Sequence, residues 1–237
     1  MIESLQPYQP IRKIAEDLYC VDGEWYETAF RRRMTIVRLK DGSLVVHSAI
    51  RMEAKDYTEL EKLGKVSIII IPNVFHYSDA KAYSERYPDA QVYVPAQMKI
   101  KCEKHLRVAG VLEKDWPLGD ELPCISFLDT LAGESVFIHK ASGTLIVTDM
   151  TFNLTSADFK SGIERFIFGK LNGILDQFGP SQLTKLVAAR NRDSVGAALK
   201  KITAQDFDRV IMSHGQIVET EGKKKFLAGY QRVYGVL

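Results

Sequence analysis

The fold is decided by the stretch from Val66 to Asp79, which reads VSIIII followed by PNVFHYSD. The mostly apolar and β-branched run between Lys65 and Pro72 predicts a strand that is buried on both faces. A short polar and aromatic turn follows, and a helix is expected to begin near Asp79. In layered α/β proteins, functional groups collect where a buried strand gives way to a helix. This turn is therefore the first candidate for a functional site.

Composition and charge restrict the class of protein. The 237 residues are 46% hydrophobic and 26% charged, which is typical of a globular protein with one large domain or two small ones. The net charge of +2 gives no reason to expect a nucleic acid or an anionic membrane as partner. Residues 1–10 lack the pattern of a signal peptide, and no apolar run approaches the ~20 residues that cross a bilayer.

The cysteines agree with a reducing compartment. Cys20, Cys102 and Cys124 are widely spaced and form no C-x-x-C motif, so reduced thiols are expected rather than a disulfide framework. We therefore predict a cytoplasmic protein.

The first half of the chain alternates strands and helices after an opening hairpin. Asp41-Gly42 between two apolar segments is a strong hairpin signal, and Gly64 closes a predicted helix. The elements expected, in order, are strands at 14–21, 34–39 and 44–49, a helix at 53–63, a strand at 66–71, a helix at 79–87, a strand at 90–94 and a helix at 98–105.

The second half repeats this plan. Its expected elements are strands at 124–129, 135–139 and 144–147, helices between 159 and 201 broken at Gly179-Pro180, a strand at 207–212 and a closing helix at 223–236. No linker or repeat separates the halves, so a single domain over residues 1–237 is expected. The pattern predicts an α/β (α+β) protein with two similar halves, each a sheet covered by helices.

Polar residues stand at four strand ends where side chains can converge. They are the Asn73/His76 turn, Asp129-Thr130, Asp149, and His214 in the turn Ser213-His214-Gly215. In their order along the chain, together with the opening hairpin, these segments resemble the metallo-β-lactamase fold superfamily from about Ala15 to the C-terminus. That resemblance implies a four-layer αββα sandwich with two mixed β-sheets. Most members of that superfamily are hydrolases with one or two metal ions at the sheet edges.

The resemblance also shows which metal ligands have been replaced. The superfamily's signature, H-x-H-x-D-H, directly follows the strand that corresponds to residues 66–71. Aligned on the strand ends, the signature histidines and aspartate fall on Asn73, Phe75, Tyr77 and Ser78, and a further histidine falls near Thr130. Only Asp149, at the aspartate that bridges both metals, and His214, at the last histidine, match.

The consequence for chemistry follows from the donors that remain. Zinc needs about four nitrogen, sulfur or oxygen donors near 2 Å. Without a metal that lowers the pKa of water to ~7, the superfamily's hydrolytic nucleophile is lost. We therefore predict a protein without a metal cofactor that binds a small molecule or a partner, with a site lined by Asn73, His76, Tyr77, Asp149 and His214. His76 and Asp149 would be its polar anchors, while Phe75 and Tyr77 would fill the former metal space.

One extra residue in the turn would give a different site. In that register His76, Asp79, Asp149 and His214 would surround one Zn, Fe or Mn ion with an open position. The protein would then be a mononuclear metal-dependent hydrolase of esters, lactones or phosphodiesters.

Structural roles also fit the same residues. His76 is compatible with a hydrogen-bonded turn residue, Asp149 with a turn cap, and His214 with a histidine paired to Asp149. Residues 166–168 and Leu171 form an apolar helical surface that is compatible with a homo-oligomer.

Overall fold

The computed structural model describes residues 7–24, 31–159, 161–189 and 191–235. The chain divides into two compact units, residues 1–116 and 117–237, and each is described by itself. The single domain expected from the sequence stays a prediction.

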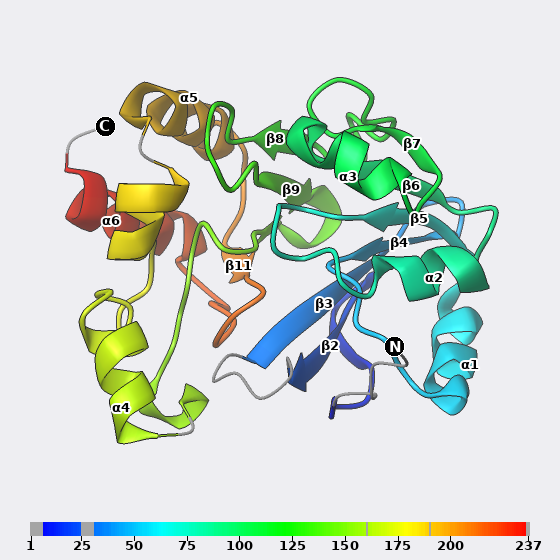
Figure 1. Cartoon of the computed structure of the whole chain (residues 1–237), viewed down its shortest axis with the longest axis horizontal. Helices are drawn as coiled ribbons and strands as arrows, with labels where there is room; N and C mark the ends of the chain where they lie inside the picture. The colour runs from blue at the N-terminus through cyan, green and yellow to red at the C-terminus, as the bar shows by residue number, and fades with distance from the viewer. Residues whose placement is uncertain (1–6, 25–30, 160, 190, 236–237) are drawn as a thin grey trace. The chain divides into compact units, whose positions relative to one another are not determined.

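Among its described residues, the first unit contains one seven-stranded mixed sheet in the order β1-β2-β3-β4-β5-β6-β7 (Figure 1). The first four strands pair antiparallel, whereas β4 to β7 are parallel. The strands are β1 (Arg12–Ala15), β2 (Leu18–Glu24), β3 (Arg31–Arg38), β4 (Leu44–His47), β5 (Val66–Ile70), β6 (Gln91–Val94) and β7 (Val108–Val111). The parallel strands are joined by α1 (Ala54–Leu63), α2 (Ala80–Arg86), and the short η1 (Ala96–Met98) with α3 (Lys99–Glu103).

The predicted hairpin is confirmed between β3 and β4, where Thr35 faces His47 in the register. Its turn is closed because a carboxylate oxygen of Asp41 accepts a hydrogen bond from the backbone N–H of Ser43 at 2.8 Å. Gly42 has a φ of +83°, a conformation that residues with a Cβ rarely adopt.

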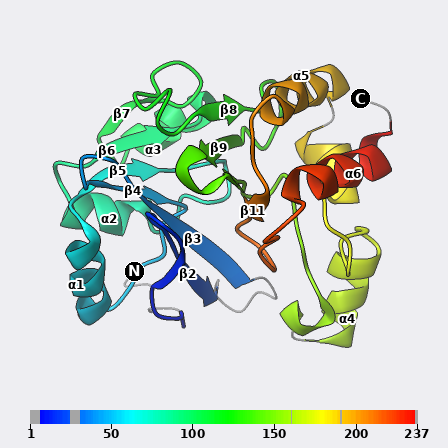
Figure 2. The ribbon, with the colours of Figure 1, turned by 180° about the vertical axis from the view of Figure 1, so that it is seen from behind.

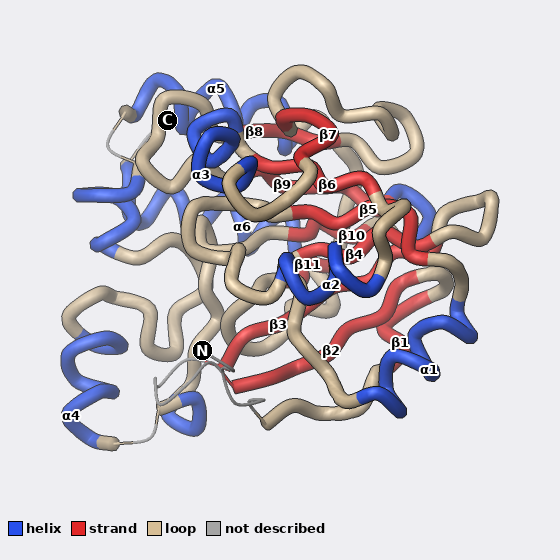
Figure 3. The backbone as a smooth tube through the Cα atoms, turned by 45° about the vertical axis from the view of Figure 1, so that its right-hand side comes forward, coloured by secondary structure: helices blue, strands red, loops and turns tan. Residues whose placement is uncertain are grey.

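Strand β5 is buried on both faces, as its isoleucines predicted. Ile69 and Ile71 belong to the core cluster that includes Tyr83 of α2, so they lie on the helix-covered face of the sheet. Ile68 and Ile70 alternate to the opposite face and are also buried. Figure 3 shows the strands of this unit in red, side by side, with α1 and α2 outside the sheet.

The second unit contains, within its described part, a four-stranded mixed sheet in the order β11-β10-β9-β8. Strands β10 and β11 are parallel, and the other pairs are antiparallel. The elements are β8 (Cys124–Ser126), β9 (Ser135–His139), η2 (Lys140–Ser142), β10 (Thr144–Ile146), η3 (Ser156–Asp158), α4 (Gly162–Glu164), η4 (Arg165–Lys170), η5 (Thr184–Ala188), α5 (Arg192–Thr203), β11 (Arg209–Ile211) and α6 (Gly222–Tyr234). Helices α5 and α6 pack on this sheet through one core, which includes Ile202 and Tyr230 (Figure 2).

Three parts of the pattern differ from expectation. The strand expected at 14–21 is two antiparallel strands, β1 and β2, separated by a turn at Glu16 and Asp17. Strand β7 was not predicted. Of the helices expected between 159 and 201, those up to Ala189 are short and partly π-helical, whereas α5 is a regular helix. The backbone N–H of Leu171 donates to the carbonyl of Phe166, and that of Ala189 to the carbonyl of Thr184, each five residues back. Gly173, at a φ of +67°, then ends the first helical segment.

The α/β class with two mixed sheets is confirmed. Among the described residues, no helix is both long and apolar enough to span a membrane.

Candidate functional site

The first group of candidate residues follows two parallel, neighbouring strands. Because β4 and β5 are parallel neighbours, the segments after them leave the sheet at the same edge. Ser48 comes directly after β4, and the turn from Asn73 to His76 comes shortly after β5. This edge brings together residues that lie far apart in the sequence.

Asn73 is fully buried and orders the turn that carries His76. Its side-chain oxygen accepts hydrogen bonds from the backbone N–H groups of Phe75 at 2.9 Å and His76 at 3.0 Å. An asparagine side chain commonly closes turns in this way, since it substitutes for a backbone acceptor. Asn73 therefore positions His76.

The imidazole of His76 contacts a serine that sequence analysis did not identify. Its Nδ1 lies 2.7 Å from the hydroxyl oxygen of Ser48, which has a φ of +57°. A hydrogen bond at Nδ1 restricts the orientation of the ring. The partners are 28 residues apart, so only the parallel pairing of β4 and β5 could have indicated this contact.

The aromatic neighbours of His76 face solvent. The exposed fractions are 49% for Phe75 and 38% for Tyr77. The expectation that these rings fill a former metal space stays a prediction. The ammonium group of Lys101, on α3, lies 4.0 Å from the centre of the Tyr77 ring. This cation–π contact holds Tyr77 at the surface.

Asp79 is engaged elsewhere. Its carboxylate forms a buried ion pair with Arg32 and also accepts a hydrogen bond from the backbone N–H of Arg51 at 3.0 Å. The ion pair with Arg32 allows an acidic side chain to be buried at the start of α2. Its role as a metal ligand stays a prediction.

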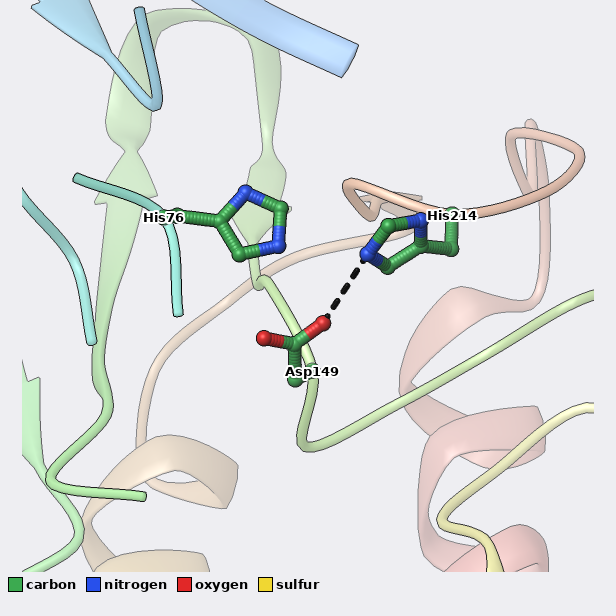
Figure 4. A group of neighbouring side chains, drawn as sticks. All are labelled: His76, Asp149 and His214. Atoms are coloured by element: carbon green, nitrogen blue, oxygen red, sulfur yellow. Dashed lines mark ion pairs between the residues drawn. The ribbon is translucent and has the colours of Figure 1, made fainter. Parts of the chain in front are cut away.

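The second group of candidate residues also follows parallel neighbours. Asp149 comes three residues after the end of β10 and His214 three residues after the end of β11. The Nε2 atom of His214 lies 3.0 Å from a carboxylate oxygen of Asp149, and both side chains are mostly buried. Figure 4 draws this pair with a dashed line, together with the side chain of His76. The pairing of these two residues was expected from the sequence and is confirmed.

A buried glutamate holds the loop of Asp149. The Glu134 carboxylate accepts hydrogen bonds from the backbone N–H groups of Thr148 (2.8 Å), Asp149 (2.7 Å) and Met150 (3.0 Å). Glu134 is fully buried. Sequence analysis did not identify this role. A single acidic residue at the start of an apolar strand could have indicated it, because a buried carboxylate needs hydrogen-bond partners.

The same loop is held from α6. The hydroxyl of Tyr230 donates to the carbonyl of Met150 at 2.8 Å. Complete burial raises the pKa of Tyr230 well above its usual value, so this phenol stays a neutral donor. The backbone around Asp149 is therefore fixed on both sides.

His214 is positioned by ring stacking and by a close backbone approach. Its ring stacks on Phe152 at 5.9 Å between centroids. Gly215 has a φ of +94°, and a Cβ there would lie 2.1 Å from the carbonyl oxygen of Asn153. The backbone N–H of Gln216 donates to that same oxygen at 2.8 Å. Only glycine permits this approach, which fixes the turn after His214.

Thr130, near the position of another superfamily histidine, also has a local structural role. Its hydroxyl donates to the carbonyl of Phe127 at 2.8 Å and accepts from the backbone N–H of Gly133 at 3.2 Å. Asn73 and Thr130 therefore use their side-chain oxygens in turns, and Phe75 has no donor atom to offer a metal ion.

Comparisons with known proteins agree with this fold. Residues 24–160 match the sequence profile of a family described as "Domain of unknown function (DUF4336)". No curated protein matches the chain in sequence.

Three solved structures illustrate the likeness in fold. The metallo-β-lactamase FIM-1 from Pseudomonas aeruginosa, in its mono-zinc form, has a TM-score of 0.61 at 11% identity and covers 98% of both chains. A mutant flavo di-iron protein from Thermotoga maritima has a TM-score of 0.62 at 12% identity, over 96% of this chain and 61% of its own. A putative diflavin flavoprotein fragment from Nostoc has a TM-score of 0.61 at 13% identity, over 98% of both chains. The chain therefore has the metallo-β-lactamase fold, as the sequence predicted.

Proposed function

The chain belongs to the DUF4336 family, and from this premise we propose that it is a metal-free binding protein built on the metallo-β-lactamase fold. Its ligand would be a small molecule or a partner. The site would be formed by Asn73, His76, Tyr77, Asp149 and His214.

The hydrogen bonds of Asn73 carry this proposal. This residue stands where the superfamily's first histidine ligand would be, and its side-chain oxygen accepts two backbone N–H groups. An oxygen used in this way supports the turn rather than a cation. Thr130 shows the same change of role, since its hydroxyl both donates and accepts within one turn.

The groups that remain suit recognition of a polar ligand. Asp149 supplies a carboxylate and His76 an imidazole, each held in place by neighbours that fix the backbone or the ring. The exposed rings of Phe75 and Tyr77 offer an apolar surface next to His76 in the chain, with the charge of Lys101 close to the Tyr77 ring. Binding sites commonly combine a few fixed polar groups with aromatic surface.

Elemental analysis tests the metal-free part of the proposal. Protein purified without chelator should contain less than one Zn, Fe or Mn per chain, and its melting temperature should not change on addition of these ions or of EDTA. The variants Asp149→Ala and His214→Ala should be less stable but equal to the wild type in metal content. One ion per chain, lost in both variants, would contradict the proposal.

A thermal-shift screen tests the binding part. Compounds that raise the melting temperature of the wild type should have less effect on His76→Ala and on Asp149→Ala, because a ligand that binds only the folded state stabilises it. Asp89→Ala, at an exposed carboxylate, is the matched control and should respond like the wild type. Compounds that stabilise all four proteins equally would place binding elsewhere.

A second function would use the nitrogen and oxygen donors that the chain keeps. His76, Asp149 and His214 can each offer one ligand atom. We propose them as the ligands of a single Zn, Fe or Mn ion in this alternative, in which the protein hydrolyses esters, lactones or phosphodiesters. The ion would lower the pKa of a bound water to ~7. Asp79, the fourth ligand of the sequence-based set, is held by Arg32. The elemental analysis above separates the two functions.

A further inference from the structure

The segment from α4 to Leu171 exposes five large apolar side chains within nine residues of chain. Ile163, Phe166, Ile167, Phe168 and Leu171 have exposed fractions between 42% and 73%. Single exposed apolar residues are common, but a group of this size marks an interaction site. We refer to these five residues as the apolar surface.

The packing of the segment explains why these side chains face outward. Gly169 is the buried residue of η4, and a Cβ there would lie 3.0 Å from the ring of Phe159 and 3.2 Å from the Cβ of Leu175. The helix thus approaches the rest of its unit through its glycine, which leaves the large neighbours of Gly169 on the outer side. Figures 1 and 2 show α4 standing apart from α5 and α6 in the same unit.

A second apolar run lies beside the first. Leu183, Leu186 and Val187, on and next to η5, are exposed by about half or more. The backbone N–H of Gln182 donates to the carbonyl of Asn172 at 2.9 Å, which ties the two helical segments together.

This part of the chain is basic. Residues 160–192 contain six lysines or arginines and two acids, a net charge of +4, although the whole chain has +2. Arg165 and Lys170 lie between residues of the apolar surface in the chain and are exposed. Of the two acids, Glu164 accepts a hydrogen bond from the backbone N–H of Ser161 in a helix cap. The net charge of the whole protein does not reveal this local excess of basic residues.

We propose that the apolar surface docks on a bilayer that contains anionic lipids. The rings of Phe166 and Phe168 and the neighbouring aliphatic side chains would lie among the upper acyl chains, and Arg165 and Lys170 would contact lipid phosphates. Exposed aromatic and aliphatic residues flanked by basic ones are the pattern of proteins that lie on a membrane without spanning it. A second copy of the chain fits less well, because pairing through this face would oppose two basic segments.

Vesicle flotation tests the proposal. The full chain should float with vesicles of phosphatidylcholine and phosphatidylglycerol and not with phosphatidylcholine alone, and high salt should weaken the binding. The double variant Phe166→Glu/Phe168→Glu should lose binding. Lys170→Glu should reduce it.

Two controls match these variants. Ile100→Glu changes an apolar residue on α3 that is even more exposed, and Lys200→Glu changes an exposed lysine on α5, so both variants should bind like the wild type. Circular dichroism should show that every variant keeps its fold, since the changed side chains are exposed.

Three results would overturn the proposal. The first is equal recovery of the wild type and of Phe166→Glu/Phe168→Glu in the vesicle fraction, and the second is recovery of neither. The third is a dimer in light scattering, without vesicle binding, that the double variant converts to a monomer. That result would assign the apolar surface to a second copy of the chain.

Discussion

The Nε2 atom of His214 lies 3.0 Å from a carboxylate oxygen of Asp149, and each residue stands three positions beyond one of two parallel, neighbouring strands. The carboxyl ends of parallel strands meet at one edge of a sheet, so this topology places the pair together without help from local sequence. The pair is at once part of the candidate site and part of the packing of the second unit.

The His214–Asp149 contact should stabilise the fold. We expect His214→Ala and Asp149→Ala each to lower the free energy of unfolding by about 1–3 kcal/mol, because each leaves a mostly buried polar partner behind. In urea unfolding, the double variant should lose less unfolding free energy than the two single variants lose in total. The exposed pair Lys65–Asp89 is the control, and its interaction should contribute about 1 kcal/mol or less to the free energy of unfolding. Strictly additive losses for His214 and Asp149 would show that the contact contributes nothing.

Glu134 should be essential for stability. Glu134→Ala removes the acceptor of three backbone N–H groups at the loop of Asp149, and we expect a loss of about 3 kcal/mol or more in the free energy of unfolding. Glu134→Gln keeps one carbonyl oxygen and should lower the free energy of unfolding by a smaller amount. Glu59→Ala, at an exposed glutamate, should change little in the same urea titration. A small effect of Glu134→Ala would mean that water replaces the carboxylate.

Substitution by alanine should lower the stability of the protein at Gly215 and raise it at Gly196. A Cβ at Gly215 would lie 2.1 Å from the Asn153 carbonyl oxygen, so Gly215→Ala should lower the melting temperature and displace His214. Gly196 lies within α5, and a Cβ there meets nothing within 4 Å. Gly196→Ala should therefore raise stability by about 1 kcal/mol. Equal effects of the two substitutions in a thermal melt would contradict this assignment.

The buried ion pair of Arg32 and Asp79 should behave as a structural unit. Asp79→Ala leaves the Arg32 charge buried without its partner and should cost about 3–5 kcal/mol of unfolding free energy. The double variant Arg32→Met/Asp79→Leu should recover much of that loss, because a buried ion pair can be replaced by apolar groups of similar volume. Full stability of Asp79→Ala would instead favour a functional role for this carboxylate.

The stability of the protein should fall between pH 9 and 11 because of Cys20. Burial of this thiol raises its pKa from 9.0 to about 11, with a smaller contribution from the Asp22 carboxylate. The folded state therefore keeps the proton after the unfolded chain has lost it, so stability that is present below pH 9 is lost as the pH rises to 11. The loss should reach up to about 3 kcal/mol.

Cys20→Ala provides the control for this pH dependence. The variant should be less stable at neutral pH, since it leaves a small cavity, but its stability should decrease less between pH 9 and 11. Urea unfolding in the presence of a reductant, at several pH values, measures both. Parallel curves for the wild type and the variant would assign the pH dependence to other groups.

Much of the fold followed from local pattern. The isoleucines of β5, the Asp41-Gly42 turn and Gly64 after α1 each specify their own element, and the structure confirms them. Strand β7 was missed because its sequence, VAGV, is short and contains small residues. The helical region after residue 159 was predicted as regular because periodicity does not reveal the π-turns around Gly169.

The candidate site was only partly predictable. The positions of Asp149 and His214 followed from strand ends in the sequence. The partners that hold the site did not, because they depend on contacts across the sheet. Ser48 reaches His76 over 28 residues and Glu134 reaches Thr148 over 14. The orientation of the Phe75 and Tyr77 rings depended on the turn and on Lys101, which no local pattern indicates.

The side chain of Asn73 makes it difficult to introduce a metal ligand at this turn. A histidine introduced there would remove the acceptor that orders Phe75 and His76, and so would disturb the neighbouring imidazole at the same moment. A designer who wished to build a metalloenzyme on this scaffold would have to supply a new turn together with the new ligand.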